Sequence, residues 1–286
     1  MPDETPAHVA VTDIAPGLWI WRIEHPHWRP DVDWQKVITC TVVDAGRERW
    51  VIDPLLPPDD ATEVWDRFAQ RAPTAVAVII PDHLRETVTD RTMWSIDALA
   101  DRYGARAFGP PTWEPGQGPP THAIQTIRPG DELPGGVRAL RDPRGWNETP
   151  LYLPEQRTIV FGDALTERDG ALRVWMSPTH EDRALPDLRA MLQLPFERVI
   201  ISHGEPVHTR DEFARALERP PWPASSLHIA AYNGGLERVK RRVESGADLG
   251  ARDERYGKTP LEWAEMGGHA DVIDYLRSMA PASSNA

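Results

Sequence analysis

Cysteine is almost absent from this chain of 286 residues, which contains only Cys40. An intramolecular disulfide is therefore impossible, and a reducing compartment such as the cytoplasm is expected. Cys40 lies in "VITCTVV". The alternation and the β-branched residues of this segment predict a strand. We therefore expect a buried and unreactive thiol.

Long apolar runs are also lacking. The longest one, "AVAVII", is far too short to cross a bilayer. The amino-terminal segment has no basic stretch followed by an apolar one, so we expect no signal peptide. These features predict a soluble, cytoplasmic protein without a membrane partner.

Positively charged residues are few: the chain has 32 basic and 44 acidic residues, which gives a net charge of −12. Nucleic acid and anionic membrane surfaces both require a basic face, so neither is expected as a main partner. Hydrophobic residues make up 40% of the chain, enough for a sizeable core. The 12 tryptophans are unusually many, and we expect them to pack loops on that core rather than to line a pocket.

The first half of the chain alternates strand and helix patterns. Strands are predicted in "KVITCTVVDAG", "RWVIDP" and the buried run "AVAVII". A helix is predicted from Asp60 to Arg71, with Asp59 or Asp60 as its cap, and another in "RTMWSIDALADRYG", which Gly104 ends.

The second half, up to about residue 206, is dominated by strands. A hairpin is predicted around Pro-Glu-Gln in "TPLYLPEQRTIVFGDALT", a helix in "ALPDLRAMLQL", and a final strand in "FERVIISHGEP". Clusters of strands broken by helices favour two sheets with helices outside them.

A linker-like segment, 218–226, is followed by an internal repeat. The two copies are offset by 34 residues, and the matching pairs are Leu227 and Leu261, Ala230 and Ala264, and Gly234 and Gly268. With "GKTPLEWAEMGGHADVIDYL" and "GADLGARD", residues 225–279 resemble ankyrin repeats. Each repeat is a helix pair that cannot bury its own apolar face, and about three are needed for independent stability. We therefore expect the two repeats to dock on the first domain, with a protein as a possible partner.

The order of elements in residues 10–210 resembles the metallo-β-lactamase superfamily. "IVFGDAL" is similar to the family strand that ends in a bridging aspartate, here Asp163, and "VIISHGEP" to its closing histidine segment, here His203. "RWVIDPLLPP" resembles its early strand that ends in Asp. The resemblance implies an α+β fold, a four-layer αββα sandwich over residues 1–219, followed by a small all-α part, 220–286, that contains the linker and about two ankyrin repeats.

The family's central metal motif, His-x-His-x-Asp-His, is broken in this chain, which has "PDHLRET" after the buried strand. If Asp82 takes the first His position, the other ligand positions hold Leu84, Glu86 and Thr87. If His83 takes it, they hold Arg85, Thr87 and Val88. Neither register rebuilds the site, because Leu and Val cannot coordinate and Arg repels a dication.

A second departure lies before the "LYL" strand, where the family has Gly-His-Thr-Pro-Gly and a further His ligand. This chain has "DPRGWNETPLYLP", which brings Arg144 and its neighbours to that place. Since zinc takes about four ligands, we do not expect a dinuclear zinc centre.

Two interpretations of the site stay open. In the first, which we favour, the domain has no cofactor, and Arg85 and Arg144 balance the clustered acids where a metal once did. It would then bind an unknown small molecule in its cleft. In the second, His83, Asp163 and His203 converge on one zinc, iron or manganese ion, with Glu86 or Asp82 in reach. The domain would then hydrolyse an ester, thioester, lactone or amide.

The candidate catalytic and metal-binding residues are thus His83, Asp163 and His203. The residues expected to line the pocket are Asp82, Arg85, Glu86, Arg144, Trp146 and His180. A third hypothesis, a pure interaction protein, has less support because two repeats offer little concave surface. Whether the chain is an enzyme at all is left open by the sequence.

The expected docking of the repeats gives the first testable prediction. A chain that ends at Pro220 should lose thermal stability or solubility relative to the full chain, because the surface beneath the repeats becomes exposed. Unchanged melting of the shortened chain, followed by circular dichroism, would contradict the prediction.

Overall fold

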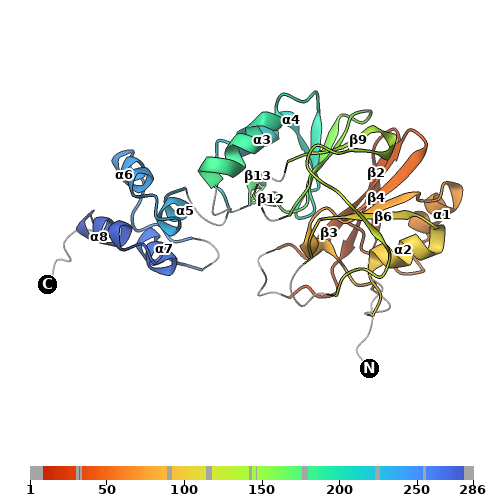
Figure 1. The fold of residues 1–286 in the computed structure, drawn as a ribbon, viewed down its shortest axis with the longest axis horizontal. Helices are drawn as coiled ribbons and strands as arrows, with labels where there is room; N and C mark the ends of the chain where they lie inside the picture. Colours follow the sequence, from red (N-terminus) through yellow and green to blue (C-terminus); the bar gives the residue numbers. More distant parts are fainter. Residues whose placement is uncertain are drawn as a thin grey trace.

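The computed structural model describes residues 9–29, 32, 34–88, 92–113, 118–141, 144, 145, 147–175, 180–222, 226–253 and 256–279 (Figure 1). Two facing β-sheets with helices on their outer sides form one part of the chain, and a bundle of short helices lies to one side of it. Among the described helices, none combines the length and the apolar character that a membrane crossing requires.

The first sheet is built from the amino-terminal part of the chain, and its strands follow one another in sequence order. They are β1 (Ala10–Ala15), β2 (Leu18–Glu24), β3 (Val37–Ala45), β4 (Glu48–Ile52), β5 (Ala75–Ala77), β6 (Arg106–Gly109) and β7 (Ile124–Thr126). Strands β1 to β4 are antiparallel, whereas β4 to β7 are parallel.

The second sheet contains, from edge to edge, β15 (Val207–Thr209), β14 (Arg198–Ile200), β11 (Thr158–Val160), β10 (Leu151–Leu153), β9 (Val137–Ala139) and β8 (Glu132–Leu133). Only β11 and β14 are parallel in this sheet. A separate hairpin consists of β12 (Leu165–Arg168) and β13 (Ala171–Val174).

The helices of the sandwich are α1 (Thr62–Gln70), α2 (Ser95–Tyr103), α3 (Leu185–Met191) and α4 (Arg210–Ala216). The other helices are α5 (Ser226–Tyr232), α6 (Leu236–Glu244), α7 (Pro260–Gly267) and α8 (Ala270–Met279). Short turns occur at η1 (Pro81–His83) and η2 (Pro134–Gly136), and η3 (His180–Ala184) is a π-helical turn.

The four layers follow from the alternation of side chains along the strands. In β2, Leu18 and Ile20 face the second sheet, in a core shared with Leu153 and Ile200. Trp19, Trp21 and their neighbours point the other way, toward α1 and α2, where Phe68 packs against both rings. The outer face of the second sheet is covered by α3 and α4 through a third core that includes Leu188 and Phe213. The αββα arrangement predicted for this part is confirmed.

Several local predictions are confirmed and others are wrong. Cys40 is fully buried, and burial raises the pKa of its thiol to about 12, as expected for an unreactive cysteine. Gly104 ends α2 in the left-handed conformation. The predicted cap at Asp59 or Asp60 is wrong, because α1 starts after Ala61 without a side-chain cap.

The β1–β2 hairpin and the β12–β13 hairpin are absent from the sequence-based prediction. The turn of the first contains Gly17 at φ +70°, and its second strand carries Trp19 and Trp21. These two rings therefore lie on a strand in the core, and Trp21 also donates a hydrogen bond to Leu55 in the loop after β4.

Two helix pairs, α5–α6 and α7–α8, form the carboxy-terminal part and share a core of their own, which includes Leu227, Ala231, Val239, Ala264 and Val272. Helix α7 begins with a capping box, in which Thr259 is the N-cap residue and Glu262, three residues later, is its partner. Two ion pairs, Arg238–Asp182 and Arg242–Glu181, join α6 to η3 of the sandwich.

Candidate functional site

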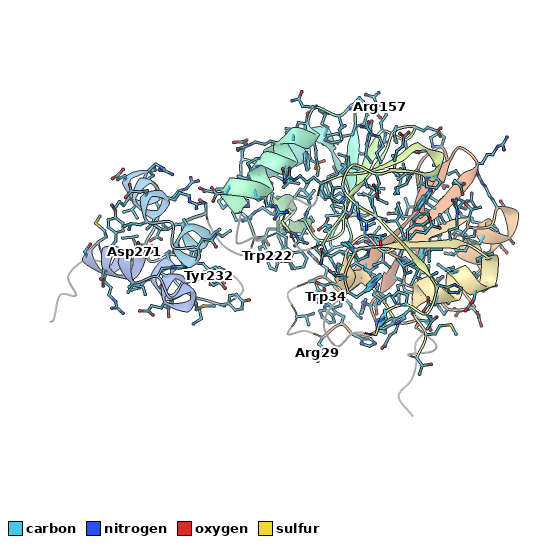
Figure 2. The ribbon with its side chains drawn as sticks, in the orientation of Figure 1. Arg29, Trp34, Arg157, Trp222, Tyr232 and Asp271 are labelled. Carbon is cyan, nitrogen blue, oxygen red and sulfur yellow. The ribbon has the colours of Figure 1, made fainter. Side chains whose placement is uncertain are left out.

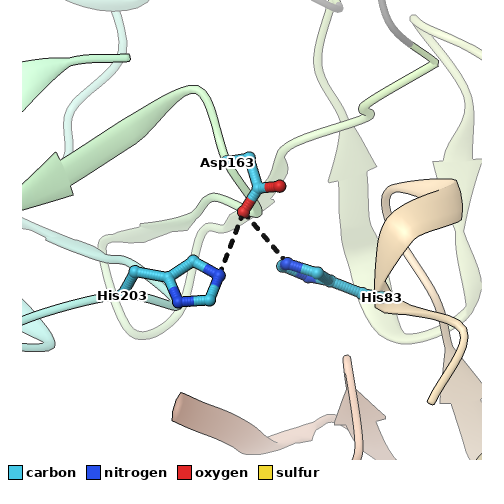
Figure 3. Close-up of side chains that lie close together, drawn as sticks. All are labelled: His83, Asp163 and His203. Atoms are coloured by element: carbon cyan, nitrogen blue, oxygen red, sulfur yellow. Dashed lines mark hydrogen bonds and ion pairs between the residues drawn. The ribbon is translucent and has the colours of Figure 1, made fainter. Parts of the chain in front are cut away.

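His83, Asp163 and His203, which are far apart in the sequence, come together between the two sheets (Figure 3). Asp163 Oδ1 lies 3.0 Å from His83 Nε2 and 3.4 Å from His203 Nε2. Each residue offers one ligand atom, and the three atoms lie within 4.8 Å of one another. Among the described residues, this is the one group of acidic, histidine or cysteine side chains that could hold a metal ion.

The topology explains why these residues meet. His83 belongs to the turn that follows β5, and Asp163 and His203 follow β11 and β14. Strand β5 is parallel to β4, and β11 is parallel to β14, so the loops in question leave the carboxyl ends of parallel strands. Such ends present side chains at one edge of a sheet. An isolated bridge between His203 and Ile38 also connects the second sheet to the first at this point.

Asp53, directly after β4, orients His83. Its Oδ2 lies 2.6 Å from His83 Nδ1, and its Oδ1 accepts a hydrogen bond from the amide of Ile79 at 2.8 Å. Asp53 has φ +49°, a left-handed conformation that costs a non-glycine residue free energy and is found at sites where the surrounding contacts enforce it. With Nδ1 bound to Asp53, His83 presents Nε2 to Asp163.

The electrostatics of the cluster are dominated by its two carboxylates. Burial and the Arg85 charge oppose protonation of His83, but Asp163 and Asp53 outweigh them and raise the pKa of its imidazole to about 9. Burial by itself raises the pKa of Asp163, yet the charge of His83 and the hydrogen bonds from both histidines hold that pKa well below its usual value. In the metal-free protein at neutral pH, His83 is therefore an imidazolium between two carboxylates.

His203 is surrounded by aromatic rings. Its ring centroid lies 5.6 Å from that of Trp34 and 5.8 Å from that of Trp175, and its Nδ1 has no hydrogen-bond partner within the described part of the chain. Burial lowers the pKa of His203, and the charges of His83 and Arg85 lower it further, although Asp163 opposes them. His203 is thus neutral beside a charged His83.

Glu148 is a residue of the site that the sequence-based reasoning missed. Its carboxylate is fully buried and accepts hydrogen bonds from the amides of Gly162, at 2.9 Å, and Asp163, at 3.1 Å. Arg144 donates to the same carboxylate at 2.8 Å. The segment "GWNETP" marked this region as a departure from the family pattern, but nothing in it distinguished Glu148 from a surface acid.

A cavity of about 580 Å³ lies beside the turn that carries His83. Its lining includes three residues predicted to line a pocket, namely Asp82, Arg85 and Glu86. His25, His27, Leu84, Trp94 and others complete it. Arg85 is buried and donates to the carbonyl oxygen of Asp53 at 2.6 Å, and His27 pairs with Glu86 at 3.3 Å. Burial and the Arg85 charge lower the pKa of His25 to about 3, so this histidine stays neutral.

Two other residues predicted to line the pocket, Arg144 and His180, lie away from this cavity. Arg144 is buried in its ion pair with Glu148. His180 begins η3, next to the helical repeats, where burial and the Arg242 charge lower its pKa to about 4. Trp146 lies outside the described residues. The described lining of the cavity includes neither Arg144 nor His180.

The turn after β5 does not restore the histidine positions of the metal motif that the sequence resembles. Leu84, which would stand at a His position in one register, is buried in the core beneath α2 with Ile96 and Leu99. Thr87 is also buried. Both side chains are therefore packed inside the protein at positions where the motif has histidines.

Two of the three separations in the cluster match those between ligands of one divalent ion. Ligands about 2.1 Å from a metal lie about 3.0 Å apart at right angles and about 3.4 Å apart at a tetrahedral angle. The two separations at Asp163 Oδ1 are 3.0 and 3.4 Å. Two imidazoles and one carboxylate suit zinc and iron(II), and the Asp53–His83 contact provides the outer carboxylate that accompanies metal-binding histidines.

Solved structures with the same fold are metallo-β-lactamases. The enzyme from Pontibacter korlensis superposes with a TM-score of 0.51 at 15% identity and covers 74% of this chain and 100% of its own. The FIM-1 enzyme from Pseudomonas aeruginosa, in its mono-zinc form, gives 0.52 at 16%, over 76% and 97%. An enzyme from Erythrobacter litoralis gives 0.53 at 16%, over 73% and 95%. The two-sheet part of the chain therefore has the metallo-β-lactamase fold.

Residues 227–277 match the family model of ankyrin repeats. The Notch-regulated ankyrin repeat-containing protein A of Danio rerio is 39% identical over 66 residues, which are 23% of this chain and 58% of that protein. Human protein phosphatase 1 regulatory subunit 27 is 44% identical over 59 residues, 21% of this chain and 38% of that protein. The chain thus spans between 38% and 58% of the length of these two relatives. The predicted ankyrin repeats are confirmed.

The raised pKa of His83 gives a prediction for the metal-free protein. Because its pKa rises from 6.5 to about 9 on folding, the stabilisation is fully present below pH 6.5 and disappears as the pH rises through 9. We expect the free energy of unfolding to fall by about 3 kcal/mol across this window. Urea denaturation at pH 6 and 9.5 measures the loss. The same slope in His83→Gln, which cannot titrate, would contradict the assignment.

Proposed function

We propose, on the premise that the two-sheet domain has the metallo-β-lactamase fold, that this domain is a hydrolase with a single-ion site. One divalent ion, zinc, iron or manganese, is held by His83, Asp163 and His203. The substrate is a small ester, thioester, lactone or amide. The observation that supports this proposal is the convergence of two imidazole nitrogens and one carboxylate oxygen within 4.8 Å.

Each residue of the cluster has a distinct part in this proposal. Asp53 holds the proton on His83 Nδ1 and leaves Nε2 for the ion. Asp163 supplies the oxygen, and its low pKa keeps that oxygen unprotonated. His203 is neutral before the ion arrives, so it binds without losing a proton, whereas His83 must lose one.

The chemistry that such an ion supplies is activation of water near neutral pH and polarisation of a carbonyl group. The chain supplies the surroundings for it. Trp34 and Trp175 cover His203 and limit the access of bulk water to that side. The cavity beside Arg85 and Trp94 has room for a small molecule next to His83.

A second candidate is the metal-free binding domain that the sequence favours. The observation in its favour is that both ring nitrogens of His83 have carboxylate partners, at 2.6 and 3.0 Å, so the buried charges are compensated without an ion. Arg85 adds a further buried positive charge nearby. Metal analysis separates the two candidates.

We predict that the purified chain, dialysed against zinc or manganese, retains about one equivalent of ion by mass spectrometry. Since His83 must release its proton, the apparent affinity should rise about tenfold per pH unit between pH 7 and 9. His203→Ala should lose the ion and any esterase or lactonase activity together.

His122→Ala is the matched control, because His122 pairs with Asp101 on the surface, away from the proposed site. This variant should bind the ion like the wild type. A chain that binds no ion at any pH, with its fold intact, would refute the single-ion site and favour the metal-free domain.

We also propose that the ankyrin repeats dock on the sandwich and leave their other surface to a protein partner. The support is the pairing of Arg238 and Arg242 on α6 with Asp182 and Glu181 of η3, and the burial of His180 beside Arg242. Exposed ion pairs contribute about 1 kcal/mol or less each and are weakened by salt. Docking through these pairs is therefore salt-dependent.

The prediction is that Arg242→Glu separates the two parts and increases the radius of gyration measured by small-angle X-ray scattering. The exchange Glu181→Arg with Arg242→Glu should restore the wild-type value, because it rebuilds the pair with reversed charges. Equal radii for all three proteins at low salt would show that these pairs do not hold the repeats.

A further inference from the structure

We propose that Glu148 is a positioning residue that fixes the direction of Asp163. The inference rests on the proposed site of His83, Asp163 and His203, because the oxygen that Glu148 controls is the one those histidines share. Glu148 Oε1 accepts from the amide of Gly162, and Oε2 accepts from the amide of Asp163. The two hydrogen bonds hold the two successive peptide planes on either side of Gly162, and with them the direction in which the Asp163 side chain leaves the backbone.

A buried carboxylate needs compensation, which Arg144 supplies. The side chains of Glu148 and Arg144 are 0% and 1% exposed, so neither charge is hydrated. Breaking such a pair leaves an unpaired buried charge, which costs several kcal/mol. Two backbone amides and one guanidinium are strong donors for a carboxylate. The carboxylate thus stays ionised and keeps both amides bound.

The segment that carries Glu148 also touches the His83 side of the site. The amide of Thr149 donates to the carbonyl oxygen of Ile79 at 2.7 Å, just after β5. Gly162 lies so close to Ile80 that a Cβ at position 162 would come within 2.8 Å of Ile80 Cγ2. Residues 148 and 149 therefore connect the backbone before His83 with the backbone of Asp163, across the two sheets.

The position of this segment in the chain sharpens the inference. It precedes β10, where the family that the sequence resembles has Gly-His-Thr-Pro-Gly and a histidine ligand. In this chain the same place contributes a buried ion pair, Arg144–Glu148. A buried carboxylate of this segment thus binds the backbone of the loop that carries Asp163.

The test compares Glu148→Gln with the wild type by titration with Co²⁺, whose absorption spectrum reports the ligand geometry. Glutamine keeps the size of the side chain, but its amide nitrogen can accept neither from the Asp163 amide nor from Arg144. We expect the Co²⁺ affinity to fall about 10- to 100-fold, as for other residues that orient a metal ligand, with a changed spectrum.

Two further variants separate positioning from general stability. Asp44→Asn breaks another ion pair, the partly buried Arg49–Asp44 pair, about 20 Å along β3 from the bridge to His203. It should lower the melting temperature and leave Co²⁺ affinity and spectrum unchanged. Glu148→Asp keeps the charge and tests the proposal if Glu148→Gln does not fold, since its shorter side chain cannot reach both amides. Wild-type affinity and spectrum in a folded Glu148 variant would overturn the inference.

A readout without metal keeps the inference distinct from the proposed function. At pH 7 in the metal-free wild type, NMR should show two protected imidazole N–H protons of His83, one bound to Asp53 and one to Asp163. Glu148→Gln should lose the proton bound to Asp163 and keep the one bound to Asp53. Absence of Co²⁺ binding by the wild type would refute the single-ion site. Retention of both N–H protons in Glu148→Gln would overturn the positioning role of Glu148, whether or not the wild type binds Co²⁺.

Discussion

One carboxylate oxygen, Oδ1 of Asp163, holds the centre of this structure together. It contacts Nε2 of His83, which follows a strand of the first sheet, and Nε2 of His203, which follows a strand of the second. Three loops that leave parallel strands therefore meet at a single atom. The burial of the cluster makes this arrangement sensitive, because an unpaired charge in such surroundings is costly. Asp53 holds His83 in place, and Glu148 holds the backbone of Asp163.

The charges around the cluster disfavour a second ion in the single-ion site that we propose. In the metal-free protein, the charges of Asp53 and Asp163 are balanced by protonated His83 and by Arg85. A divalent ion that displaces the proton of His83 adds one net positive charge. A second ion would add two more positive charges beside the buried, fixed guanidinium of Arg85. The repulsion between these positive charges therefore opposes the binding of a second ion.

The sequence was sufficient for the layers, the repeats and the three central residues, because each leaves a local pattern. Alternation in "VITCTVV" and the "FGDAL" and "ISHGEP" strand ends mark where Asp163 and His203 stand. Glu148 leaves no such mark, since its role depends on amides 14 and 15 residues away that only the tertiary fold brings near. His180 was assigned to the pocket because it lies in a polar loop. Its surroundings are set instead by the packing of α6, which the loop sequence does not contain.

The three candidate ligands are held in place by different means. His83 is oriented by Asp53, and Asp163 by Glu148; both orienting carboxylates are buried and also bind backbone amides. His203 is held by rings and by its backbone bridge to Ile38, and within the described residues its Nδ1 has no acceptor. Hydrogen bonds fix the rotation of a ring more firmly than aromatic contacts do. His203 therefore has fewer hydrogen bonds than His83 to fix its ring, since only its Nε2 contacts a carboxylate among the described residues.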